Sequence, residues 1–134
     1  MTRSALSIVI LLIASRAIAE GSIESARELY LTGRYEEAIE QYESLEDVSP
    51  SSLALGIARC EAATGKDDDA IKRLNAALEK DEDPSPALYA ELAKLHFVRG
   101  RYDDAQAHCA KALAVDKSQP LAHWINAELH RTRG

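Results

Sequence analysis

The sequence predicts an all-α protein built as a solenoid of antiparallel helix pairs, because one short motif recurs at a nearly constant interval. The segment GRYDDA at 100–105 repeats GRYEEA at 33–38 and is echoed by GKDDDA at 65–70. The glycines at 33, 65, 100 and 134 are 32, 35 and 34 residues apart, which is the range of stacked helical repeats. Each copy is therefore predicted to be a helix, a glycine turn and a second helix.

The residues around each glycine support this prediction. Glycine can adopt a positive φ where a first helix ends, and the acidic residues after it lie at the positive N-terminus of a second helix. Ser49-Pro50 and Ser85-Pro86 supply an N-cap followed by proline in the first turn. The predicted helices are about 22–32, 35–47, 51–64, 67–80, 86–99, 102–115 and 120–132, which gives seven.

The composition indicates a helical domain that does not bind nucleic acid. Of the 134 residues, 46% are hydrophobic and 28% charged, and the net charge is −6. A dedicated DNA- or RNA-binding domain is expected to carry a basic face. The acidic balance argues against nucleic acid as a partner.

The first 19 residues have the pattern of a secretory signal peptide. Arg3 precedes an apolar run from Ala5 to Ala14, and small residues at Ala17 and Ala19 form a cleavage site before Glu20. The chain is thus predicted to be exported, periplasmic or secreted, with a signal peptide at 1–19. The alternative is an uncleaved membrane anchor. Ten apolar residues are too few to cross a bilayer, which takes about 20, so no stable membrane span is expected after cleavage.

No catalytic, cofactor or metal site is predicted. Phosphate-binding loops, nucleophile elbows and cysteine–histidine pairs in a suitable context are missing from the sequence. His96, His108, His123 and His130 lack the spacing of zinc ligands, and we interpret them as one packing residue, one surface residue and two residues of the terminal cap. Cys60 and Cys109 are predicted to be unpaired, small buried residues, because the repeat places them too far apart for a disulfide. The chain is predicted not to be an enzyme.

The combination of residues at fixed places resembles the tetratricopeptide repeat family. The third unit carries the resemblance most clearly, and the first supports it through Ala26, Gly33, Tyr35, Ala38 and Tyr42; the second departs from it at Asp67, where the family has tyrosine. The third-unit residues are Tyr89, Leu92, Ala93, Gly100, Tyr102, Ala105, Ala112 and Leu113.

The resemblance covers residues 20–134. It implies a right-handed superhelix with units at about 19–50, 51–84 and 86–119, and a half unit or cap at 120–134. Two interpretations of 120–134 remain open. It is either a solvating cap or the beginning of a further unit in a longer array.

The resemblance also implies a binding groove. In this family the first helices of successive units line the concave side, and Arg27, Arg59 and Lys94 share the ninth position there, with Glu128 in the fourth unit. Tyr30 and Phe97 share the twelfth. These residues predict a peptide-binding site, although solvent-facing helix positions are often basic without any such role. The family's clamp for a carboxylate tail is not matched, since Ile23 and Arg27 occupy its positions. The predicted peptide-binding residues are Arg27, Tyr30, Arg59, Lys94 and Phe97.

The predicted function is therefore that of a non-catalytic, exported scaffold that binds a protein segment, an acidic one being among the options, in its concave groove. One alternative is that the chain is the N-terminal helical module of a larger exported enzyme of the hydrolase class that continues beyond Gly134. Another is a structural array that associates with itself through an open end.

Overall fold

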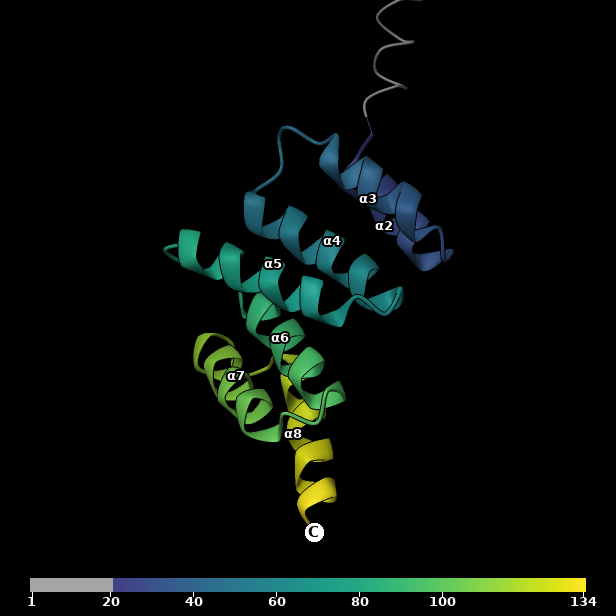
Figure 1. Cartoon of the computed structure of the whole chain (residues 1–134). Helices are drawn as coiled ribbons and strands as arrows, with labels where there is room; N and C mark the ends of the chain where they lie inside the picture. Colours follow the sequence, from purple (N-terminus) through teal and green to yellow (C-terminus); the bar gives the residue numbers. More distant parts are fainter. Residues whose placement is uncertain (1–20) are drawn as a thin grey trace, which may run out of the picture. The chain divides into compact units, whose positions relative to one another are not determined.

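The computed structural model describes residues 21–134, so the predicted signal peptide at 1–19 lies outside the described residues. Within 21–134 the chain forms seven α-helices and no strand, which confirms the predicted fold class of an all-α helix-pair solenoid (Figure 1). None of these helices is long and apolar enough to span a membrane. The helices are α2 (Ile23–Leu31), α3 (Tyr35–Glu43), α4 (Pro50–Ala63), α5 (Asp67–Lys80), α6 (Pro86–Val98), α7 (Tyr102–Val115) and α8 (Pro120–Arg133).

The chain divides into two compact units, Met1–Val48 and Ser49–Gly134. In the described part of the first unit, α2 and α3 pack against each other, and Ala26 and Ala38 are fully buried. The second unit contains the pairs α4/α5 and α6/α7 together with α8, and α6 is its central element because it contacts the four other helices. Any surface built from α4, α6 and α8 is thus contained in one unit.

The glycine of each repeat ends a first helix in the way the sequence predicts. Gly100 has a φ of 71°, a left-handed conformation that glycine adopts at little cost. The Gly100 N–H donates to the Phe97 carbonyl and the Arg101 N–H to the His96 carbonyl, both at 2.9 Å. These two bonds define a Schellman cap, and the turns at Gly33 and Gly65 repeat them. The three sequence copies therefore specify three equivalent turns.

Helix α3 ends earlier than the sequence predicts. We expected it to reach residue 47, but it ends at Glu43. The Ser44 hydroxyl donates to the Gln41 carbonyl at 2.7 Å, and a serine that binds nearby backbone in this way competes with continued helix. The other boundaries agree with the sequence prediction to within one residue.

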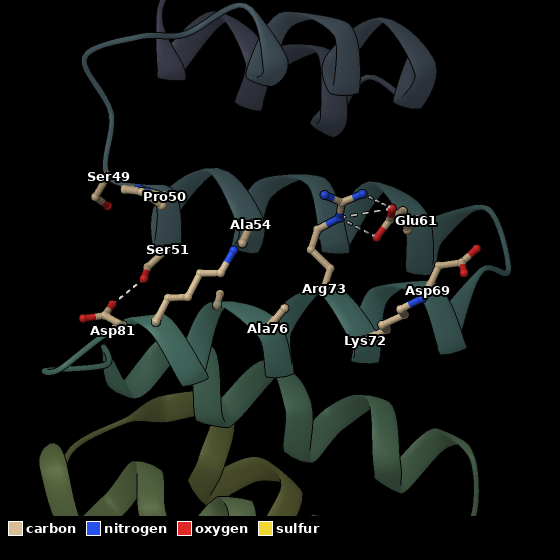
Figure 2. A pocket seen from close by; sticks show the side chains of 12 residues that line it. Ser49, Pro50, Ser51, Ala54, Glu61, Asp69, Lys72, Arg73, Ala76 and Asp81 are labelled. Atoms are coloured by element: carbon tan, nitrogen blue, oxygen red, sulfur yellow. Dashed lines mark hydrogen bonds and ion pairs between the residues drawn. The ribbon is translucent and has the colours of Figure 1, made fainter.

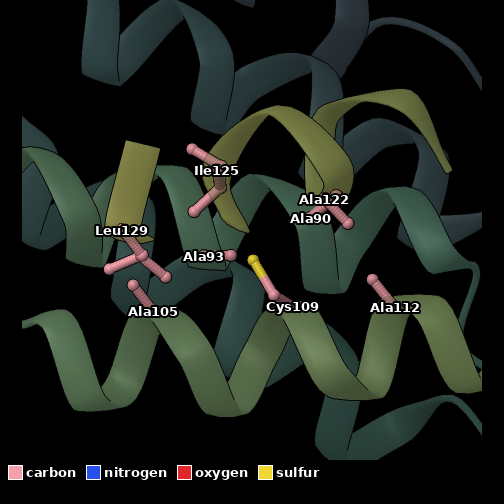
Figure 3. Packing of buried hydrophobic residues seen from close by; sticks show 8 residues of the cluster. All are labelled: Ala90, Ala93, Ala105, Cys109, Ala112, Ala122, Ile125 and Leu129. Atoms are coloured by element: carbon pink, nitrogen blue, oxygen red, sulfur yellow. The ribbon is translucent and has the colours of Figure 1, made fainter. Parts of the chain in front are cut away.

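Small side chains bring α6, α7 and α8 close together (Figure 3). Alanines from all three helices form most of this cluster, and Ile125 and Leu129 of α8 fill the space between them. Cys109 lies fully buried among them, and burial raises the pKa of its thiol to about 11. Cys60 is also buried, and both cysteines are free, as predicted. The cluster consists of Ala90, Ala93, Ala105, Cys109, Ala112, Ala122, Ile125 and Leu129.

Candidate protein-binding face

The first helices of the second unit lie next to one another, since α6 contacts both α4 and α8. Side chains from these three helices form two groups of contacts, one charged and one aromatic, that are adjacent along α6, and we call them together the first-helix face. Its members are Arg59, Glu91, Lys94, Phe97 and Trp124.

A buried carboxylate lies at the centre of the charged part of this face. Glu91 of α6 is only 1% exposed. Arg59 of α4 donates from Nε to Glu91 Oε2 at 3.0 Å, and Lys94, one turn along α6, pairs with Glu91 Oε1. The side chains of Arg59 and Lys94 remain 35% and 31% exposed. The group links α4 to α6 and carries one net positive charge.

The apolar part of the face is aromatic. The Phe97 ring lies 6.4 Å from the Trp124 ring in an edge-on arrangement of 72°, and 5.7 Å from the ring of Tyr102. Trp124, the single tryptophan of the chain, is 52% exposed. Aromatic pairs of this geometry are stabilising, and a tryptophan edge left in water provides apolar area for a partner. Trp124 therefore forms the apolar part of the face together with Phe97, which the sequence predicted as a binding residue.

The structure brings together three of the five predicted site residues. Arg59 and Lys94 meet at Glu91, and Phe97 is one turn from Lys94 on α6. Arg27 and Tyr30 lie on α2 of the first unit, where Arg27 is exposed and Tyr30 packs against Tyr35 with ring centroids 5.8 Å apart. These two residues are therefore described within the first unit alone.

Sequence reasoning missed Glu91 and Trp124. Glu91 precedes Lys94 by three residues, a spacing typical of an ion pair on a helix. This signal was available, but a charged residue in a helix is usually exposed, and Glu91 is not. Trp124 could have been noticed as the only tryptophan on a first helix.

A concavity lies between α4 and α5, away from the first-helix face, and has a volume of about 700 Å³ (Figure 2). Two of its charged side chains, Arg73 and Glu61, bind each other. Arg73 donates from Nε to both carboxylate oxygens of Glu61, at 3.1 and 3.0 Å, and from Nη2 to Oε1 at 2.6 Å. The Ser51 hydroxyl donates to Asp81. Small residues, Ala54, Ala76 and Ala77, line the rest of the space. These contacts hold α4 against α5 and present no reactive group.

Two histidines stack inside the α6/α7 pair. The rings of His96 and His108 are 5.2 Å apart and almost parallel, and Tyr89 lies on the His108 ring with centroids 6.5 Å apart. His96 is buried and His108 is half-buried against it, whereas the sequence interpretation placed one of these two rings at the surface. In the part of the chain that the structure describes, no group of three metal-binding side chains comes together.

Burial of this pair predicts loss of stability in acid. Desolvation lowers the pKa of both rings from 6.5, and that of His108 falls to about 4, with His96 and Lys111 adding to the effect and Asp104 opposing it. Arg101 lowers and Asp104 raises the pKa of His96. Because the folded pKa values are depressed, the neutral rings stabilise the fold fully above pH 6.5, and this contribution is lost as the pH falls towards 4.

We therefore expect the melting temperature to fall between pH 6.5 and pH 4. His108→Leu should flatten that fall, because it removes the ring with the lower pKa while keeping an apolar side chain. Circular dichroism melts of both proteins at each pH provide the measurement. His130→Leu, at an exposed position, is the control and should leave the wild-type profile unchanged. Identical profiles for wild type and His108→Leu would contradict the assignment.

Comparison with known proteins identifies the family. Sequence models of the tetratricopeptide repeat match residues 17–95 and 90–134. The chain belongs to the tetratricopeptide repeat family. No curated protein matches the sequence.

Solved structures share the fold. PcrH from Pseudomonas aeruginosa is 20% identical with a TM-score of 0.68, over 84% of this chain and 89% of that one. PcrH in complex with the chaperone binding region of PopB is 19% identical with a TM-score of 0.63, over 81% and 89%. The type III secretion translocator chaperone SycD of Yersinia enterocolitica is 20% identical with a TM-score of 0.65, over 81% and 83%. At these identities the likeness concerns the fold.

Proposed function

We propose that this protein is a non-catalytic scaffold that binds a segment of another protein on its first-helix face. The observation that carries the proposal is Trp124, which is half exposed beside Phe97 on the helices that line the concave side in this family. Tryptophan anchors often account for a large share of the binding energy at protein interfaces. Arg59 and Lys94 add donors for polar groups of the partner.

The solved relatives support the same class of function. PcrH was crystallised with the chaperone binding region of PopB, which is a segment of a partner protein. In this chain the ion pairs of the face join Arg59 and Lys94 to Glu91. These three groups do not form a nucleophile–base pair. A binding role accounts for the exposed aromatic edge, whereas catalysis would leave it unexplained.

Trp124→Ala is the test of this function. Peptides are first selected on the purified full chain from a displayed random library, and one selected peptide is synthesised with a fluorescent label. Truncation of a central aromatic anchor costs about 2 kcal/mol or more, which corresponds to roughly 30-fold weaker binding. Fluorescence anisotropy titrations of the wild type and the variant measure this difference.

Val115→Ala is the matched control for Trp124→Ala. Val115 is 55% exposed at the end of α7, outside the first-helix face, so the substitution removes exposed apolar area without altering the face. Its affinity for the peptide should equal that of the wild type. Unchanged affinity in Trp124→Ala, or an equal loss in both variants, would exclude the first-helix face as the binding site.

We further propose that the scaffold acts outside the cytoplasm, on the basis of the predicted signal peptide at 1–19. Cleavage after Ala19 would make Glu20 the first residue of the mature protein. Intact-mass spectrometry of the exported protein is expected to find that N-terminus. Recovery of a chain that still begins at Met1 from the membrane fraction would favour the uncleaved anchor instead.

A further inference from the structure

We infer that the first-helix face selects a segment with one carboxylate close to one large apolar side chain, rather than a run of acidic residues. The inference rests on the proposed function and defines the chemistry of its partner. It replaces the broader expectation of an acidic peptide with a specific arrangement of two side chains.

The charge of the face sets the number of carboxylates. Two cations, Arg59 and Lys94, surround a single buried anion, Glu91, so one positive charge remains uncompensated. Glu128 of α8 occupies the ninth position in the fourth unit and pairs with Arg131, at 3.1 Å from Nε and 2.6 Å from Nη2. That pair is neutral and adds no attraction. One partner carboxylate balances the face, and a second would meet no further uncompensated charge among its members.

The donors needed to hold that carboxylate are present. Arg59 binds Glu91 through Nε, which leaves the terminal nitrogens of its guanidinium group as further donors. Lys94 has three ammonium protons, and a single contact with Glu91 leaves others for a ligand. Both side chains are about one third exposed, so a ligand can reach them without rearrangement of the face. Glu91 acts as a positioning residue, because its buried carboxylate pairs with both cations and holds them in place.

The spacing between the charged and apolar parts sets the arrangement in the ligand. Lys94 and Phe97 are three residues apart on α6, which places their Cβ atoms about 5–6 Å from each other. Trp124 extends the apolar part beyond Phe97. An extended segment advances about 3.3 Å per residue. The carboxylate and the apolar side chain of the ligand should therefore lie within about three residues of each other.

The experiment is selection of a random displayed peptide library on the full chain, followed by binding measurements with synthetic peptides. The wild type should enrich sequences that carry one Asp or Glu within about three positions of Phe, Trp, Leu or Met. Replacing that acid with its amide in a synthesised peptide should weaken binding about fivefold or more. The same replacement should have little effect on binding to Lys94→Gln, and Arg59→Gln serves as a second variant should Lys94→Gln fold poorly.

Lys72→Gln is the control, because Lys72 lies exposed on α5 and lines the α4/α5 concavity instead of the first-helix face. It should retain the full wild-type preference for the acid. Enrichment of acidic runs without an apolar residue would overturn the inference, and so would equal binding of the acid and amide peptides to the wild type. In either case, binding that still depends on Trp124 would leave the proposed function intact. If no peptide prefers the wild type over Trp124→Ala, the proposed function fails as well.

Discussion

Replacing Ala105 with glutamate is expected to unfold helices α6, α7 and α8. Ala105 is fully buried in the cluster that these helices form (Figure 3). Overpacking a core site costs about 1–3 kcal/mol, and burying an unpaired carboxylate adds further to that. A small domain has only about 5–15 kcal/mol of stability in total. Helicity by circular dichroism and the urea midpoint should both fall sharply.

Ala110→Glu is the matched control on the same helix. Ala110 is exposed on α7, so the same change in side chain adds a solvated charge and should alter stability by no more than about 0.5 kcal/mol. If the urea midpoint of Ala105→Glu equalled that of the wild type, α6, α7 and α8 would not pack against one another at Ala105. Equal losses in both variants would point to helix propensity rather than burial as the cause.

Glu91→Ala should give the second large effect on stability. The substitution removes the acceptor shared by Arg59 and Lys94 and leaves a cavity between α4 and α6. Removing one partner of a fully buried ion pair costs about 3–5 kcal/mol, but water can reach these two cations, so we expect about 2 kcal/mol. Urea denaturation followed by circular dichroism measures the loss.

Glu128→Ala supplies the comparison for Glu91→Ala. Glu128 pairs with Arg131 three residues along α8, and the arginine of that pair is 75% exposed. Exposed pairs of this kind contribute about 0–1 kcal/mol. If Glu91→Ala proved no more costly than Glu128→Ala, the buried carboxylate would not be a structural link between α4 and α6.

The repeat was readable from the sequence because each turn depends on a local requirement. A glycine at a positive φ, proline in the first turn and acidic residues after the glycine each act within a few residues, so the pattern predicts the seven helices of residues 21–134 correctly. The early end of α3 was missed because Ser44 binds the backbone through its side chain, an effect that hydrophobic periodicity does not register.

The site was harder to predict because it depends on contacts between helices. The repeat register correctly placed Arg59 and Lys94 on neighbouring first helices, but it could not show that Glu91 lies buried between them. The stacking of His108 on His96 is missing from the sequence prediction for the same reason. Whether a polar side chain such as Glu91 is buried depends on the space that its neighbours leave. That space is set by tertiary packing, which the sequence pattern does not show.

The most direct test of the central claim is to map where a selected peptide binds. Titration of the isotope-labelled protein with that peptide, followed by NMR, should shift the indole resonance of Trp124 and the amide resonances of α6 around Lys94 and Phe97. Resonances of α5 and α7 residues that lie away from these three side chains should shift little. The account predicts this restricted pattern. Shifts concentrated on α5 around Lys72 and Lys80, with the Trp124 indole unchanged, would contradict it.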